Sequence, residues 1–177
     1  MLRDLLSDRP AIEFLDGVAH PKVSPKRTHG RLQFLLARLL DDQGGANGEV
    51  VPEWRCKIGS DDAEPTSFVP DVAWVSDSRL ALLSDEEAEA PPFSPDVAIE
   101  IRSPGDDLAY LSRKIACYLA TGSLLVLDVD PLRRAVTAHC ADGVIVFGDG
   151  EQLKTKPVTW FSFDVATLFK AAQRRGS

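Results

Sequence analysis

The stretch from Pro95 to Gly122, PDVAIEIRSPGDDLAYLSRKIACYLATG, indicates a strand, a tight turn and a helix. Its first part alternates apolar residues with others, and this two-residue period predicts a β-strand over Asp96–Arg102. The alternation places Glu100 on the face opposite the larger apolar side chains. A buried carboxylate is costly unless a cation, a metal ion or hydrogen bonds compensate its charge. Glu100 is therefore the first candidate for a functional residue.

The second part of the stretch predicts a helix over Asp106–Thr121 with a lysine on its apolar face. Asp106 favours the positive N-terminal end of a helix, and Gly122 favours the position after its last turn. The apolar face carries Leu108, Leu111, Ile115, Tyr118 and Leu119 at helical spacing. Lys114 follows the same spacing, so it either extends to solvent along the margin of this face or shares a polar site. The carboxylate of Glu100 on the preceding strand favours the shared site.

The composition is that of an ordinary soluble protein. The chain has 177 residues, of which 44% are hydrophobic and 27% charged, and we expect one domain over residues 1–177. No apolar run is long enough for a membrane helix, and the N-terminus lacks the features of a secretory signal. The three cysteines are odd in number and far apart, which indicates reduced thiols. We therefore expect a cytoplasmic protein without membrane contact.

The net charge of −7 argues against a protein that coats nucleic acid without specificity. One region has the opposite sign, because basic residues concentrate between positions 22 and 38. It includes Lys22, Lys26, Arg27, His29, Arg31 and Arg38. DNA therefore remains a candidate partner, with a modest affinity that depends strongly on salt. The sequence leaves open whether the protein acts as a homodimer.

The remaining sequence predicts further strands and helices around the central unit. A turn at Asp16-Gly17 indicates a hairpin over residues 11–20, and a leucine pattern indicates a helix that ends at Gln43-Gly44-Gly45. Strand patterns follow at Glu49–Ile58, Phe68–Ser76 (where Pro70 indicates an edge strand or a start at Asp71), Leu124–Val129, Ala135–Cys140 and Val144–Phe147. A short helical turn is expected around Ser84–Ala88, and Asp164 is expected to cap a closing helix over Val165–Gln173.

Acidic residues stand at the start of two of these strands. Asp71 and Asp96 each follow a proline, and Glu100 lies further along the second strand. Carboxylates from neighbouring strands can converge on Mg²⁺, which takes oxygen ligands and keeps several waters, so all three are candidate ligands. A bound metal ion lowers the pKa of a water and offsets charge on a phosphodiester, and a nearby lysine can position that water. Asp, Glu and Lys together are thus the residue types needed for metal-dependent phosphodiester hydrolysis.

The order of these motifs resembles that of a known family. The segments PDVAWVS, PDVAIEIRSP, K-x₃-YLATG and LLVLDVDPLRRAVTAH follow one another with spacing similar to that of the Uma2 family, formerly called DUF820. This family consists of restriction-endonuclease-like proteins within the PD-(D/E)XK nuclease superfamily, and the likeness covers most of the chain. It implies an α/β fold in which helices flank a mixed central sheet of restriction-endonuclease type, with a C-terminal β-hairpin extension.

The resemblance also implies roles for particular residues. Asp71 matches the first metal-binding acid, Glu100 the acid of the (D/E)XK strand, and Lys114 the lysine that this family carries on the following helix. Glu13 and His29 match an early acid and an early histidine of the family and would be auxiliary or substrate-contacting residues. The metal ion would be Mg²⁺ or Mn²⁺, Lys114 would position the water, and the substrate would be DNA.

Arg102 departs from the family pattern, which usually has an apolar residue at this position. Alternation places its side chain on the same face as that of Glu100. It could contact a substrate phosphate, although a guanidinium that stays protonated is a poor base. Alternatively, it forms an ion pair with Asp96 or Glu100 and so weakens the metal site. The sequence leaves these two alternatives open.

A metal-dependent DNA endonuclease is the function that these patterns favour. The alternative is a catalytically inactive module that binds nucleic acid or protein on a nuclease fold, because a fold by itself does not establish an activity. A glycosidase with a pair of carboxylates is disfavoured, since only 7% of the residues are aromatic and they do not cluster in the sequence.

Overall fold

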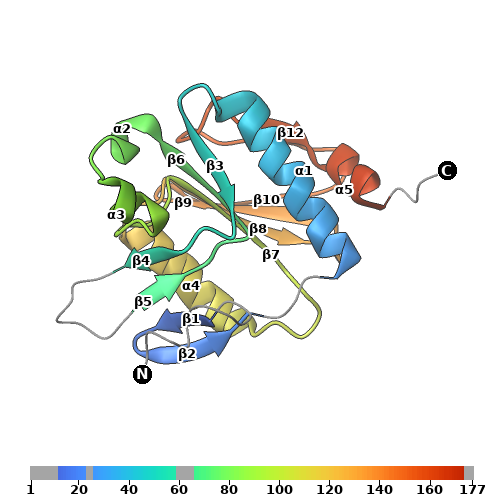
Figure 1. Cartoon of the computed structure of the whole chain (residues 1–177). Helices are drawn as coiled ribbons and strands as arrows, with labels where there is room; N and C mark the ends of the chain where they lie inside the picture. The colour runs from blue at the N-terminus through green and yellow to red at the C-terminus, as the bar shows by residue number, and fades with distance from the viewer. Residues whose placement is uncertain (1–11, 23–25, 59–65, 174–177) are drawn as a thin grey trace.

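A six-stranded mixed sheet forms the centre of the computed structural model (Figure 1), which describes residues 12–22, 26–58 and 66–173. Its strands are β3 (Gly48–Pro52), β6 (Val72–Ser76), β7 (Val97–Ile101), β8 (Leu125–Asp130), β9 (Ala135–Cys140) and β10 (Gly143–Phe147). They lie in the order β10-β9-β8-β7-β6-β3. Strands β7 and β8 run parallel, and the other neighbours run antiparallel. The predicted mixed central sheet is therefore confirmed, and the predicted C-terminal hairpin, β9 and β10, forms one edge of it.

Helices cover both faces of this sheet, as the sequence predicts. They are α1 (Arg27–Gly44), α2 (Asp77–Leu80), α3 (Asp85–Glu89), α4 (Leu108–Ala120) and α5 (Val165–Gln173). Helix α4 connects β7 to β8 across one face, which is the crossover that parallel neighbours require. Helices α1 and α5 lie side by side over the other face (Figure 1).

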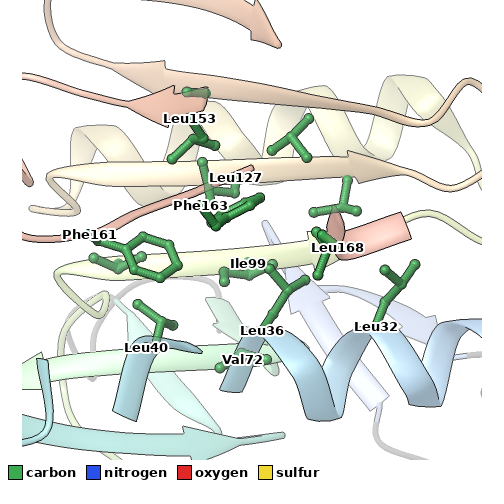
Figure 2. Close-up of a cluster of buried hydrophobic side chains, with 14 of the residues drawn as sticks. Leu32, Leu36, Leu40, Val72, Ile99, Leu127, Leu153, Phe161, Phe163 and Leu168 are labelled. Carbon is green, nitrogen blue, oxygen red and sulfur yellow. The ribbon is translucent and has the colours of Figure 1, made fainter. Parts of the chain in front are cut away.

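The leucine pattern of α1 packs directly on the sheet. Leu32, Leu36 and Leu40 are fully buried, and Figure 2 shows them on the side of α1 that faces the strands. On β7, the residues that belong to this same cluster are Val97, Ile99 and Ile101, whereas Ala98 packs with side chains of α4. Alternation along β7 thus places the even-numbered side chains, including Glu100, toward α4. This is the arrangement that the candidate site requires.

A smaller antiparallel sheet packs beside α4. Its strands are β1 (Ile12–Leu15), β2 (Val18–Pro21), β4 (Cys56–Ile58) and β5 (Thr66–Phe68), in the order β2-β1-β5-β4. The predicted hairpin is confirmed over the described residues, and its turn places Asp16 and Gly17 at φ values of 51° and 76°. A third, two-stranded sheet pairs β11 (Gln152–Lys154) with β12 (Ser162–Asp164).

Two of the predicted strands are divided in the structure. The predicted strand Glu49–Ile58 becomes β3 and β4 in different sheets, because the chain turns at Glu53, where φ is 56°. The predicted strand Phe68–Ser76 becomes the end of β5 followed by β6, and the break falls at Pro70, which has no N–H for a sheet ladder. This break leaves Asp71 immediately before β6.

The other local predictions agree with the structure. Helix α3 begins with a capping box between Ser84 and Glu87, and Asp164 accepts a hydrogen bond from the N–H of Thr167 in the first turn of α5. The three cysteines are free thiols. Within the described ranges, none of the helices combines the length and the apolar character needed to cross a membrane.

Two glycines give opposite expectations for stability. A Cβ at Gly48 would lie 2.4 Å from the backbone oxygen of Val75, so Gly48→Ala should lower the free energy of unfolding by about 1–3 kcal/mol. Gly30 lies in α1 with nothing within 4 Å of an added Cβ, so Gly30→Ala should raise it by up to about 1 kcal/mol. Urea unfolding of both variants measures the difference. Equal stabilities would contradict the close approach of β3 to β6 at Gly48.

Candidate active site

A pocket of about 270 Å³ lies beside the C-terminal end of β7, where several distant segments of the chain meet. Its charged and polar lining includes Glu13 of β1, Lys22 after β2, His29 of α1, Asp71 before β6, Glu100 of β7 and Lys114 of α4. The structure therefore brings together the three residues that the sequence singles out for chemistry, together with the auxiliary Glu13 and His29.

Lys114 is buried at the centre of this pocket. Only 2% of the residue is exposed, and its Nζ lies 2.6 Å from Oε1 of Glu13 and 2.7 Å from Oε1 of Glu100. Burial by itself lowers the pKa of Lys114, but the two carboxylates outweigh this effect and raise it. The ammonium is therefore held between two acids and does not extend to solvent.

Two tyrosines complete the hydrogen bonding of these acids. Tyr118 donates from its hydroxyl to Oε1 of Glu100 at 2.9 Å, and Tyr110 donates to Oε2 of Glu13 at the same distance. Glu13 also accepts a hydrogen bond from the backbone N–H of Val69 at 2.8 Å. Burial and the neighbouring carboxylates raise the pKa of both tyrosines, so the hydroxyls remain protonated donors. The sequence pattern places Tyr118 on the apolar face of the helix and gives no sign of its polar contact.

Glu100 is a buried acid whose pKa is raised. Burial raises its pKa to about 7, and although Lys114 opposes this effect, the carboxylates of Asp71 and Glu13 add to it. The contacts of Glu100 with Lys114 and Tyr118 both use Oε1. Its second oxygen, Oε2, takes part in neither of these contacts.

Asp71 is buried but faces the ammonium of Lys22 and the imidazole of His29. Its Oδ2 accepts a hydrogen bond from the N–H of Ile101 at 2.7 Å. Its Oδ1 lies 2.7 Å from Nζ of Lys22 and 3.3 Å from Nε2 of His29, yet none of the described groups is aligned to donate a hydrogen bond to it. Burial alone would raise the pKa of Asp71, but His29 and Lys22 outweigh it and hold the pKa well below its usual range. Oδ1 therefore lies between the ammonium of Lys22 and the imidazole of His29.

Lys22 belongs to the site, although the sequence identifies it only as part of a basic region. Besides Asp71, its ammonium contacts Oε1 of Glu53 at 3.0 Å. Gln33 of α1 supports this arrangement by donating to Glu53 and to the backbone oxygen of Asp71, each at 2.9 Å. The nearby carboxylates raise the pKa of Lys22 despite its burial, so it remains charged.

A family sequence profile described as "Putative restriction endonuclease", Uma2, matches residues 2–166. The chain belongs to the Uma2 family. A crystal structure described as a putative nuclease belonging to DUF820, from Anabaena variabilis ATCC 29413, is similar to it with a TM-score of 0.80. The two chains share 21% identity over 97% of this chain and 98% of that chain, a likeness that establishes the fold. No curated protein matches the chain.

The fold of this Uma2 chain does not bring Asp96 to this pocket. Asp96 precedes β7, whereas Glu100 lies near the other end of the strand, and four extended residues span about 13 Å. Asp96 instead accepts hydrogen bonds from Nη1 of Arg79 at 2.9 Å and from the N–H of Ser76 at 2.8 Å. Alternation places Asp96 and Glu100 on one face but not at one point, so we do not retain Asp96 as a metal ligand.

Of the two alternatives that the sequence leaves open for Arg102, the ion pair with Asp96 or Glu100 does not form in the structure. Arg102 donates from Nε to Oδ1 of Asp128 at 2.7 Å and from Nη1 to Oδ2 of Asp130 at 3.2 Å. These partners lie on β8, which pairs in parallel with β7 and places Asp128 opposite Glu100. Arg102 therefore pairs with carboxylates of β8 and not with Asp96 or Glu100. It does not weaken the proposed metal site by neutralising either of these two acids.

A divalent ion is compatible with the donors in this Uma2 pocket, although the protein alone does not form a full ligand shell. Within residues 12–22, 26–58 and 66–173, no cluster of three or more His, Cys, Asp or Glu side chains is arranged to hold a metal ion. Asp71 and Glu100 do line one pocket, and Oδ1 of Asp71 is a buried acceptor that already lies beside the ammonium of Lys22. Such a pair suits Mg²⁺, which commonly takes one or two carboxylates and keeps several waters.

Proposed function

We propose that this protein is a Mg²⁺- or Mn²⁺-dependent endonuclease that hydrolyses phosphodiester bonds in DNA. Membership of the Uma2 family supports a nuclease-like function. The observation that carries the finer proposal is the convergence of Asp71, Glu100 and Lys114 in one pocket from three separate elements. Structural ion pairs are usually exposed, so a buried lysine between two acids at a pocket wall favours a chemical role.

Each residue of the pocket has its own role in the proposed reaction. Asp71 and Glu100 would hold the ion, through Oδ1 and Oε2. Bound there, a divalent ion supplies Lewis acidity toward a phosphate oxygen and lowers the pKa of a coordinated water. Lys114 uses two of its three donors on Glu13 and Glu100, which leaves the third for a water or a phosphate oxygen. Lys22 places positive charge at the same wall for the substrate phosphate, and the imidazole of His29 lies beside it as a further substrate contact.

One observation favours a second candidate, a catalytically inactive module that binds nucleic acid. The protein's own cations already neutralise the acids of the pocket, since Lys114 contacts Glu13 and Glu100 while Lys22 contacts Asp71. Such a cluster can hold the fold together without a metal ion. The hydrolytic proposal therefore requires that Lys22 leaves Asp71 when an ion binds.

The two candidates differ in a nicking assay. Purified protein with Mn²⁺ or Mg²⁺ is expected to nick plasmid DNA or cut branched or single-stranded DNA, and EDTA should abolish the cleavage. The assay belongs at low salt, because a protein with a net charge of −7 depends on local cations for DNA contact. DNA binding without cleavage under every metal condition would support the inactive module instead.

A further inference from the structure

A second, larger cavity adjoins the candidate active site. Its volume is about 530 Å³, and it shares His29, Ser103, Gly105 and Asp106 with the pocket that holds the acids. The shared residues form a common rim, and Nδ1 of His29 lies 3.3 Å from Oγ of Ser103 across it. A ligand chain that crosses this rim can therefore occupy both spaces at once.

The walls of this cavity combine apolar surface with fixed positive charge. Pro104, Leu108, Pro131 and Leu132 supply apolar surface, and Leu132 is 81% exposed. Arg102 also lines the cavity, and its guanidinium is anchored by Asp128 and Asp130. An anchored guanidinium presents a planar surface of the kind on which nucleobases stack. The cavity thus offers both the apolar contact and the planar cation that a base requires.

The charge of the cavity selects among nucleotide ligands. Three cations, Lys26, Arg102 and Arg133, line it, and two acids, Asp106 and Asp130, line it as well. This near balance suits a nucleotide with one phosphodiester charge better than a polyphosphate, which the two carboxylates would repel.

We propose that this cavity binds one unpaired nucleotide of a DNA strand whose neighbouring phosphodiester lies at Asp71 and Glu100. This inference rests on the proposed function, because the phosphodiester at Asp71 and Glu100 sets the orientation of the bound strand. A base inside a duplex is stacked and paired, and it enters such a cavity only after extrusion from the helix, which costs a few kcal/mol. The preferred substrate class is therefore single-stranded DNA, or DNA with unpaired nucleotides, and not intact duplex.

Fluorescence anisotropy in EDTA tests the cavity without cleavage. The probes are a labelled single-stranded oligonucleotide, a duplex of equal length, and an abasic strand of equal length. We expect the single strand to bind about tenfold or more tightly than both others, because each stacked base contributes about 1–3 kcal/mol. Equal affinities for the single strand and the abasic strand, or for the single strand and the duplex, would overturn the proposal.

A pair of leucine variants locates the binding. Leu132→Glu should weaken single-strand binding about tenfold by placing a carboxylate on the cavity wall. Leu82→Glu is the matched control, because Leu82 is also 81% exposed but lies in the turn after α2, outside the residues that line either pocket. Equal affinity of the two variants would overturn the assignment to this cavity.

The outcomes separate this inference from the hydrolytic proposal. Binding that depends on the base and on Leu132, with no cleavage under any metal condition, would support base binding in the cavity and refute the proposed nuclease activity. Plasmid nicking together with equal affinity for all three probes would support the nuclease and refute the cavity. The absence of any binding by the single strand would refute the cavity as well.

Discussion

Replacing Lys114 with methionine is expected to lower the free energy of unfolding by about 3–5 kcal/mol at neutral pH, because two buried carboxylates lose the cation between them. Methionine keeps much of the length of the side chain and leaves no large cavity. The sequence alone predicts that Lys114 serves chemistry and not packing, so that its replacement would leave the stability unchanged. Its contacts with Glu13 and Glu100 change that expectation. Urea unfolding monitored by circular dichroism measures the difference.

The loss in the Lys114→Met variant should depend on pH with a defined sign. The pKa of Glu100 is raised to about 7, above its ordinary value of 4.5, with burial as the main cause, and Lys114 is the group that most opposes this rise. Without Lys114 the pKa in the folded protein rises further. The contribution of Glu100 to the deficit should therefore be smallest below about pH 7, where this carboxyl is protonated in both folded proteins, and should grow as the pH rises above 7 toward the higher pKa of the variant.

The neighbouring Arg113 supplies the control for this variant. It precedes Lys114 on α4, but its side chain is 59% exposed and pairs with the exposed Asp16. An exposed ion pair contributes about 0–1 kcal/mol, so Arg113→Met should be nearly neutral. Equal losses in the two variants would contradict the placement of the Lys114 ammonium between buried acids.

The sequence predicts Glu100 and Lys114 at the centre of this site, because two local repeats, the alternation of a strand and the spacing of a helix, determine where these side chains point. Alternation along β7 turns Glu100 away from the core that packs against α1, and helical spacing turns Lys114 toward β7. Both patterns act within one continuous stretch. The same reasoning fails for Asp96, because alternation fixes a face of a strand but not a position along it.

Contacts between distant segments lie beyond such patterns. Glu13 is separated from Lys114 by 101 residues, and only the family resemblance indicates that it belongs to the site. The role of Lys22 depends on how the chain after β2 passes Asp71, and the partners of Arg102 depend on the parallel pairing of β7 with β8. The divided strands show the same limit, since hydrophobic patterning does not specify which sheet a strand joins.

Asp71→Asn and Lys22→Met are expected to change the affinity for Mn²⁺ in opposite directions. Asn keeps an oxygen for the N–H of Ile101 but removes the charge that faces Lys22, so calorimetric affinity for Mn²⁺ should fall about 100-fold or more and cleavage should be lost. Met at position 22 removes the ammonium that lies 2.7 Å from Oδ1 of Asp71. Its affinity for Mn²⁺ should rise about tenfold, which corresponds to about 1.4 kcal/mol.

Asp96 provides the matched control for this comparison. It is also a buried carboxylate next to a strand of the central sheet, but it pairs with Arg79 away from the pocket. Asp96→Asn should leave the affinity for Mn²⁺ unchanged in a protein that circular dichroism shows to be folded. A weakening equal to that of Asp71→Asn would restore Asp96 as a ligand and refute the site proposed above. An unchanged affinity in both Asp71→Asn and Lys22→Met would show that the ion does not bind at Asp71, and the paired acids and lysines would then serve to hold the fold.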